Sequence, residues 1–121
     1  MGATQSVELQ LALIREADVT RARPDATIFL SVVTPWEMTI KHALGRLELS
    51  DSPRSLVYAQ IARHAYQPLD VTLEHVLAVS ELPLHHADPF HRLLIAQART
   101  EGLTLVTGDP IFRRYDLEVL W

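Results

Sequence analysis

Apolar stretches alternate with amphipathic stretches along this chain, and the alternation predicts strands and helices in turn. From Val7 to Ala17, apolar residues at Val7, Leu11 and Ile14 are separated by charged and polar residues, which predicts an amphipathic helix. Residues 27–33 are β-branched, aromatic or apolar on both faces, as in a buried strand of a parallel sheet. We therefore expect a helix first and a buried strand after it.

Capping residues and prolines predict where the next helix begins and ends. Thr34, Pro35 and Glu37 have the order of an N-cap, a proline in the first helical position and the glutamate of a capping box. Gly45 is expected to end this helix, because glycine adopts the left-handed conformation that follows many helices.

The same signals recur to the C-terminus and predict a regular order of elements. The predicted helices begin at Ser52-Pro53, Thr72, Asp88-Pro89 and Asp109-Pro110, with ends near Ala65 and Gly102, and the predicted strands are 69–71, 103–107 and 117–120. Strands that alternate with helices imply parallel strands joined by right-handed crossovers. We expect an α/β fold, a three-layer α/β/α sandwich with a mainly parallel sheet, which binds ligands beyond the carboxyl ends of its strands.

Length and composition favour one ordinary globular domain spanning residues 1–121. The chain is 48% hydrophobic and 21% charged, and it contains no cysteine, which excludes disulfide scaffolds and thiolate metal sites. No apolar run is long enough for a bilayer and the N-terminus lacks the pattern of a signal peptide, so we expect a cytoplasmic protein without membrane contact. A net charge of −4 argues against a broad basic surface, but it is compatible with a nuclease that gathers carboxylates around a cation.

Three acidic residues are candidates for such a site. Glu37 and Asp109 each follow a predicted strand at the start of a helix, and Asp88 begins a helix after a loop. The positive end of a helix dipole keeps a carboxylate ionised, as a hard-cation ligand must be. Acidic residues also commonly cap helices, so the residues alone leave both a metal site and simple capping open.

Two segments resemble VapC-like toxins of the PIN-domain family. Residues 31–41 (SVVTPWEMTIK), with GRLEL at 45–49, resemble the segment in which a family strand ends and a Trp-Glu pair begins a helix. Residues 82–98 (LPLHHADPFHRLLIAQA) resemble a family segment containing Asp-Pro-Phe-Asp-Arg-Leu-Leu-Ile-Ala, followed by a strand that ends in Thr-x-Asp. The resemblance extends from about Ile28 to Trp121.

This resemblance implies a metal-dependent endoribonuclease. It implies metal-site and catalytic roles for Glu37 and Asp109, with Asp88 as a further candidate and Thr107 as a nearby polar residue. The implied cofactor is Mg²⁺ or Mn²⁺. The implied partners are an RNA substrate, a VapB-like antitoxin protein and a second copy of the chain in a homodimer.

The sequence departs from the family pattern in two places. The family opens with a short apolar strand that ends in Asp and lies centrally in the sheet, and the sequence shows no counterpart before the first predicted helix. His91 stands where the family has a metal-site Asp, and imidazole suits manganese or zinc better than magnesium. Asp88, one helical turn earlier, is a candidate replacement.

These departures leave three hypotheses. The first is an active VapC-like endoribonuclease toxin, and the second is a catalytically degenerate PIN domain that only binds an antitoxin or RNA. The third is that the native protein begins upstream of Met1 with the missing strand. Because a sheet without its central strand exposes edges that invite pairing, we also expect an oligomer.

The functions of the other polar and aromatic residues stay open between two interpretations. Lys41, Arg46 and Arg92, together with Arg113 and Arg114, are candidates for contacting RNA phosphates, although scattered surface cations are commoner. Trp36 is a candidate for stacking a base, but after Pro35 we expect it to anchor the helix in the core. His85, His86 and His91 fit no standard zinc motif, and we expect solvent-exposed loop histidines.

Overall fold

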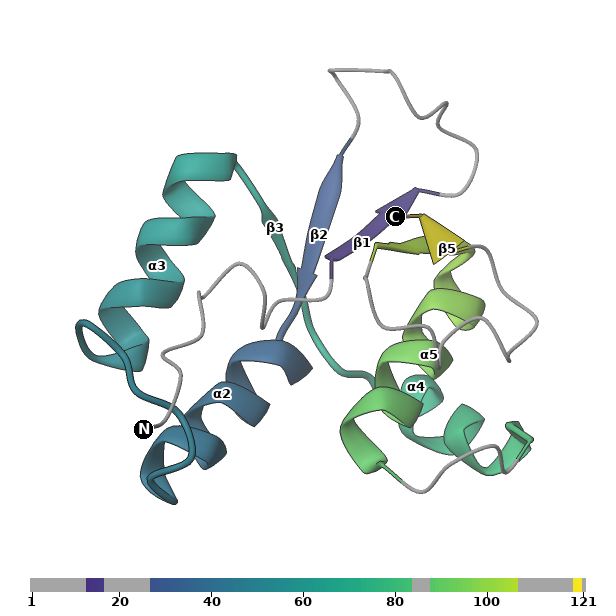
Figure 1. Ribbon diagram of the computed structural model, residues 1–121. Helices are drawn as coiled ribbons and strands as arrows, with labels where there is room; N and C mark the ends of the chain where they lie inside the picture. The colour runs from purple at the N-terminus through teal and green to yellow at the C-terminus, as the bar shows by residue number, and fades with distance from the viewer. Residues whose placement is uncertain (1–12, 17–26, 84–87, 107–118, 121) are drawn as a thin grey trace.

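The computed structural model describes residues 13–16, 27–83, 88–106 and 119–120 (Figure 1). It is a mixed α/β structure, as the sequence predicts. The strands are β1 (Leu13–Glu16), β2 (Ile28–Ser31), β3 (Gln67–Leu69), β4 (Leu103–Val106) and β5 (Val119–Leu120). The helices are α2 (Val33–Ala43), α3 (Pro53–His64), α4 (Leu73–Ala78) and α5 (Pro89–Glu101), with a 3₁₀ turn at Val79–Glu81.

The strands form one five-stranded sheet in the order β3-β2-β1-β4-β5. The pairs β2–β3 and β4–β5 are parallel, whereas β1 is antiparallel to both β2 and β4. The sheet is therefore mixed, and the expectation of a mainly parallel sheet needs this correction.

The central strand β1 contradicts two expectations from the sequence. The predicted helix over Val7–Ala17 is wrong at Leu13–Glu16, because these residues hydrogen-bond with a strand on each side, a non-local interaction that overrides a short amphipathic pattern. The sheet also has a strand at its centre, so the expected open interior and the argument for an oligomer that followed from it no longer hold. The strand, however, runs in the opposite direction to β2 and β4: Glu16, its last residue, pairs with Leu103, the first residue of β4.

Helix α2 begins differently from its prediction. Its N-cap is Val32, and the hydroxyl of Ser31 accepts a hydrogen bond from the N–H of Val33 at 3.1 Å. Thr34 lies inside the first turn and is 3% exposed, and its Oγ1 has no hydrogen-bond partner among the described residues. The predicted capping box between Thr34 and Glu37 is therefore wrong, because the helix starts before Thr34.

The end of α2 confirms the prediction for Gly45. This glycine has φ +72°, and its N–H bonds to the carbonyl of His42 at 3.1 Å. The next N–H, of Arg46, bonds to the carbonyl of Lys41 at 2.9 Å. These two bonds form a Schellman motif, which satisfies carbonyls that the helix leaves open.

Local signals also predict α3 and α5 correctly. Ser52 caps α3 by accepting the N–H of Ser55 at 3.1 Å, and Ala65 ends the helix with φ 55°. Asp88 caps α5, and Gly102 ends it with φ +67°. The predicted strand at 69–71 lies two residues earlier, at β3, and the helix after it begins at the predicted cap, Thr72.

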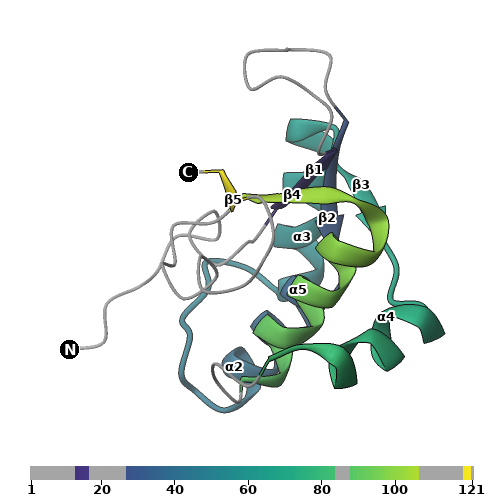
Figure 2. The same cartoon turned by 90° about the vertical axis from the view of Figure 1, so that its right-hand side faces the viewer.

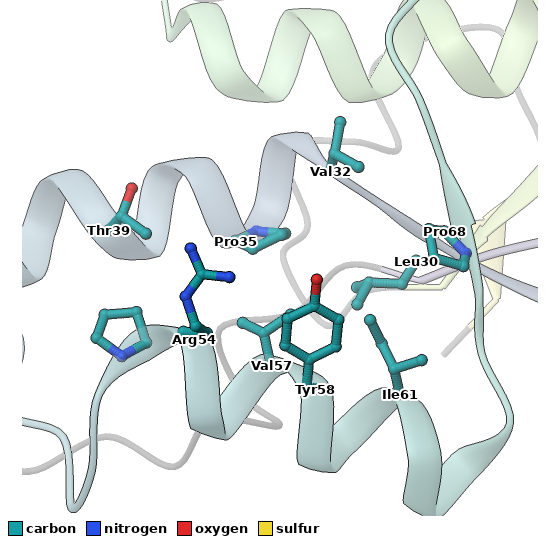
Figure 3. Close-up of a pocket in the computed structure, with 10 residues that line it drawn as sticks. Leu30, Val32, Pro35, Thr39, Arg54, Val57, Tyr58, Ile61 and Pro68 are labelled. Carbon is teal, nitrogen blue, oxygen red and sulfur yellow. The ribbon is translucent and has the colours of Figure 1, made fainter.

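The main core lies between α5 and the sheet. The buried side of α5 contributes Leu94, Ile95, Ala96 and Ala98, which pack with Val33, Leu82, Leu103 and Leu105. Phe29 and Leu69 pack against this cluster, while Leu30 and Pro68 line a groove with α3 (Figure 3). Figures 1 and 2 show α3 and α5 on opposite sides of the strands.

A buried polar network connects this core to the start of α2. The hydroxyl of Ser31 donates to Oε1 of Gln97 on α5, and Nε2 of Gln97 donates to the carbonyl of Asp70 at 3.3 Å. Nδ1 of the fully buried His75 accepts the N–H of Thr72 at 3.0 Å, so its ring proton is on Nε2, which donates to Glu101 at 2.7 Å. The network fixes the β2–α2 junction against α5.

No helix within the described ranges has the length and apolar character needed to cross a membrane.

Candidate metal centre

The first turns of α2 and α5 lie against each other. Trp36 on α2 contacts Phe90 on α5 in an edge-to-face arrangement, with ring centroids 4.9 Å apart and an interplanar angle of 77°. The bond between Ser31 and Gln97 joins the end of β2, just before α2, to α5 within the core. These two contacts explain how residues about fifty positions apart in the sequence come together.

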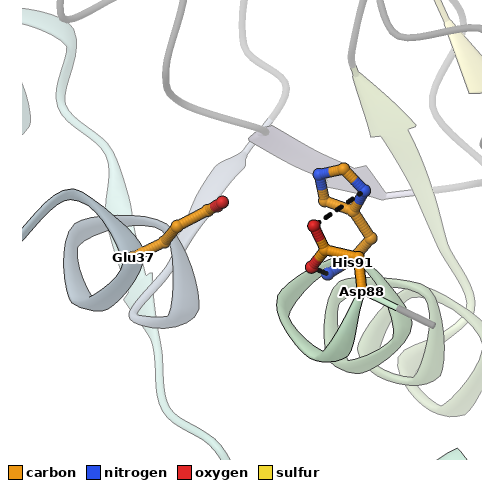
Figure 4. Close-up of side chains that lie close together, drawn as sticks. All are labelled: Glu37, Asp88 and His91. Atoms are coloured by element: carbon orange, nitrogen blue, oxygen red, sulfur yellow. Dashed lines mark hydrogen bonds and ion pairs between the residues drawn. The ribbon is translucent and has the colours of Figure 1, made fainter. Parts of the chain in front are cut away.

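Glu37, Asp88 and His91 form a cluster at this junction. Each offers one potential ligand atom, and these atoms all lie within 4.8 Å of one another. Figure 4 shows Glu37 pointing from α2 toward the Asp88–His91 pair at the start of α5. The side chains are 15%, 36% and 24% exposed respectively, so the cluster is sheltered but accessible to a hydrated ion.

Asp88 is both a helix cap and a potential metal ligand, the two roles that the sequence leaves open. Its Oδ1 caps α5 by accepting the N–H groups of Phe90 at 2.9 Å and His91 at 3.1 Å. Its Oδ2 lies 3.7 Å from Nδ1 of His91. One oxygen of Asp88 therefore holds the helix, while the other faces the cluster.

Lys41 and Arg46, two of the residues predicted to contact RNA, follow Glu37 along the chain. Nζ of Lys41 lies 3.1 Å from Oε2 of Glu37, one helical turn earlier, and the Lys41 side chain is 43% exposed. Arg46 is exposed just beyond the end of α2. Both remain candidates for contacting phosphates.

Arg92, the third residue predicted to contact RNA, has structural contacts. Its side chain is buried at 8% exposure, and its guanidinium donates to the carbonyls of Pro83 at 3.0 Å, Val79 at 3.1 Å and Leu82 at 3.5 Å. A guanidinium held in this way supports the segment before α5, and the contact of Arg92 with RNA phosphates stays a prediction.

The predicted role of Trp36 as a core anchor is wrong. We expected it to anchor α2 in the core, but it is 54% exposed and makes its ring contact with Phe90 at the surface. Pro35 and Thr39 line the groove toward α3, which turns Trp36 away from that groove.

Other predicted residues lie outside the described ranges. They are Thr107 and Asp109, the neighbouring helix predicted at Asp109-Pro110, and the cations Arg113 and Arg114. His85 and His86 also fall there, so among the three histidines considered for zinc only His91 can be placed. The expected meeting of Glu37 with Asp109 stays a prediction.

A family model for the PIN domain matches residues 7–118. The chain belongs to the PIN-domain family. PIN domains are generally metal-dependent nucleases, which gives the cluster of Glu37, Asp88 and His91 a chemical context. No curated protein and no solved structure matches the chain significantly.

The donor atoms of this PIN domain fit a divalent cation. Two carboxylates supply hard oxygen ligands, and PIN domains typically bind Mg²⁺. The third donor, His91, is an imidazole, which Mg²⁺ accepts poorly and Mn²⁺ or Zn²⁺ accept readily. The cluster therefore fits Mn²⁺ better than Mg²⁺.

Nothing in the sequence identifies the residues that position this cluster. Ser31, Gln97 and Phe90 have ordinary spacing within their segments, and nothing in the sequence pairs Ser31 with Gln97 or Trp36 with Phe90. Only the fold shows that Ser31 and Gln97 are polar residues buried among apolar ones. Only the fold shows that Phe90 contacts Trp36.

Proposed function

We propose that this PIN domain is a VapC-like toxin, an endoribonuclease that cleaves RNA phosphodiester bonds with the help of a divalent metal. One observation carries the proposal: Glu37, Asp88 and His91 converge from two helix starts to within 4.8 Å. A bound Mg²⁺ or Mn²⁺ ion would activate water and stabilise the charge that grows on the scissile phosphate. The sandwich of helices about the sheet and the single-domain organisation over residues 1–121 are parts of this proposal.

Each residue of the cluster has a distinct proposed role. Glu37 and the Oδ2 of Asp88 supply negative ligands, and His91 supplies a neutral nitrogen ligand. The two capping bonds that Oδ1 of Asp88 accepts would keep its carboxylate in a fixed orientation while Oδ2 binds the ion. Lys41, released from its ion pair with Glu37, and Arg46 would contact RNA phosphates.

Asp109 is proposed as a fourth donor, with Thr107 beside it. Leu30 of β2 and Val106 of β4 both pair with Leu13 of β1, so β2 and β4 end at the same edge of the sheet. Two strand spacings amount to about 9–10 Å. The chain therefore leaves β4 close to where β2 leads into the helix of Glu37, three residues before Asp109.

The partners follow from the family resemblance. We propose a VapB-like antitoxin that neutralises the toxin, a homodimer as the functional assembly, and action in the cytoplasm. The filled centre of the sheet removes the structural argument for a dimer, so the resemblance alone supports it.

The alternative is a degenerate PIN domain that binds an antitoxin or RNA without cleaving. Two observations favour it. His91 replaces a carboxylate, and the reversed β1 sends its carboxyl end, at Glu16, to the edge of the sheet opposite the cluster. The carboxyl end of β1 therefore does not lie beside Glu37 and Asp88.

The decisive experiment measures RNA cleavage by the purified protein with Mg²⁺ or Mn²⁺. We expect Glu37→Gln and Asp88→Asn to abolish cleavage, because each removes a charge at nearly constant shape and Asn still caps a helix. Glu74→Gln, a control at an exposed acid of α4, should leave cleavage unchanged. Wild-type protein that binds RNA and either metal yet cleaves nothing would establish the degenerate alternative.

A further inference from the structure

Gln97 is a polar side chain at the centre of the core. It is fully buried on α5, between Ala96 and Ala98, which belong to the apolar cluster against the sheet. Replacing both partners of a buried hydrogen bond with apolar groups of the same shape can leave stability nearly unchanged, so stability alone does not require an amide at this position. A hydrogen bond differs from an apolar contact in having a definite geometry, because its strength depends on the positions of donor and acceptor.

The amide of Gln97 is held in one orientation. Its Nε2 donates to the carbonyl of Asp70 at 3.3 Å and lies 3.4 Å from Nδ1 of His75. That nitrogen of His75 is an acceptor, because it also accepts the N–H of Thr72 at 3.0 Å. Both neighbours of Nε2 are therefore acceptors, and the other end of the amide, Oε1, faces Ser31 and accepts its hydroxyl proton.

Ser31 connects Gln97 to the start of α2. Because the hydroxyl proton of Ser31 goes to Gln97, its oxygen can accept, and it accepts the N–H of Val33, the first residue of α2, at 3.1 Å. The neighbouring N–H of Val32 donates to the carbonyl of Leu69, the last residue of β3, at 3.0 Å. Through these bonds the end of β2, the end of β3 and the middle of α5 are fixed against one another.

The same segments carry the donors of the candidate metal centre. Glu37 follows Ser31 by six residues, and Gln97 follows His91 by six residues on the same helix. Figure 4 shows Glu37 pointing from α2 toward the donors of α5. A metal ion tolerates only small errors in the positions of its ligands, so a bond that fixes the start of α2 against α5 also sets the distance between these donors.

We propose that Gln97 is a positioning residue of the metal centre: through Ser31 it holds the beginning of α2 where Glu37 meets the donors of α5. The inference rests on the proposed metal-dependent nuclease, and it adds a residue that is too deeply buried to contact RNA. A Gln97 side chain that only stabilised the core would change the free energy of unfolding and leave the metal affinity of the folded protein unaltered. A positioning residue changes both.

The test measures the binding of Mn²⁺ alone to the purified protein, under conditions in which circular dichroism shows each variant to be folded. The electron paramagnetic resonance signal of the free ion reports how much Mn²⁺ is bound. We expect Gln97→Leu and Ser31→Ala each to weaken Mn²⁺ binding roughly tenfold, as is typical when residues that orient metal ligands are removed. Because both variants break the same bond, the double variant should bind Mn²⁺ about as well as Gln97→Leu alone.

Two further variants separate positioning from a general loss of stability. Ser31→Thr keeps the hydroxyl and should keep most of the Mn²⁺ affinity that Ser31→Ala loses. Leu105→Ala opens a cavity in the same core, because Leu105 is fully buried, but it removes no hydrogen-bonding side chain. This control should unfold more easily in urea and still bind Mn²⁺ with close to wild-type affinity.

The outcomes distinguish this inference from the proposed function. Wild-type Mn²⁺ affinity in Gln97→Leu and Ser31→Ala overturns the positioning role even if the protein cleaves RNA, and an equal loss of affinity in Leu105→Ala overturns it as well. If Gln97→Leu does not fold, the comparison of Ser31→Ala with Ser31→Thr decides in the same way. A wild-type protein that binds no Mn²⁺ also overturns the positioning role. Mn²⁺ binding that depends on Gln97 in a protein that cleaves no RNA supports that role and removes only the nuclease.

Discussion

Replacing Arg92 with methionine tests whether this buried cation supports the fold or contacts RNA. Methionine keeps much of the aliphatic stem and removes the guanidinium, which donates to three backbone carbonyls at 3.0, 3.1 and 3.5 Å. The bonds to Pro83 and Val79 have good lengths, and the one to Leu82 is at the limit of a hydrogen bond.

The structure sets the size of the expected effect. A buried carbonyl that loses its partner costs about 1–3 kcal/mol, so the two good bonds give an estimate of about 2–6 kcal/mol for Arg92→Met. For 121 residues, an unfolding entropy of about 2.1 cal/mol/K per residue converts each kcal/mol into about 4 °C of Tm. We therefore expect Tm to fall by about 8–24 °C.

Thermal and urea unfolding measure this loss, and Arg99→Met is the matched control. Arg99 lies on the same helix but is exposed, so the same chemical change should alter the free energy of unfolding by less than about 0.5 kcal/mol. If Arg92→Met unfolds like the wild type while its RNA affinity falls, the structural role argued for Arg92 is refuted and a phosphate contact takes its place.

Three further predictions concern the core network, the end of α2 and the metal. Gln97→Leu should lower the free energy of unfolding by about 2–3 kcal/mol in urea denaturation, because Ser31 and the carbonyl of Asp70 lose their buried partner; an unchanged midpoint would contradict the network. Gly45→Ala should cost about 1–2 kcal/mol by the same assay from its φ of +72° alone, since a Cβ would meet open space, and a neutral result would show that the backbone relaxes. His91→Asp should raise the affinity for Mg²⁺ relative to Mn²⁺ by about tenfold in calorimetry, because it exchanges an imidazole for a carboxylate; an unaltered ratio would mean that His91 is not a ligand.

Elements with strong local signals could be predicted from the sequence. The cap at Ser52, the cap at Asp88, and the left-handed ends at Gly45 and Gly102 act within one helical turn, so their effect does not depend on the rest of the fold. Helices α3 and α5 and the end of α2 follow directly.

The elements that could not be predicted depend on distant partners. The four residues of β1 carry a pattern compatible with a helix, and their conformation is decided by pairing with β2 on one side and β4 on the other. The predicted start of α2 at Thr34 is wrong for a related reason. Thr34 has the side chain of a good cap, but the hydroxyl of Ser31, fixed by Gln97 from another helix, already serves the first N–H of α2.

In the candidate site, too, the sequence predicts local features but not contacts between distant residues. Glu37 and Asp88 could be identified as acids at helix starts, because helix boundaries are local features. Their convergence could not be identified, since it depends on the contact between Trp36 and Phe90 and on the Ser31–Gln97 bond. His91 was recognisable only against the family pattern, and its place beside Asp88 follows from the helical spacing of three residues.

The ion pair between Lys41 and Glu37 does not prevent Glu37 from binding a metal. An ion pair one helical turn apart, with Lys41 43% exposed, is worth about 0.3–0.5 kcal/mol, and part of this is screened at physiological salt. In the proposed metal site, a divalent ion shared with Asp88 and His91 would offer Glu37 a stronger partner than Lys41 does. Because Glu37 is one of two carboxylates in the cluster of Glu37, Asp88 and His91, its release from Lys41 is the step on which the proposed metal binding would depend.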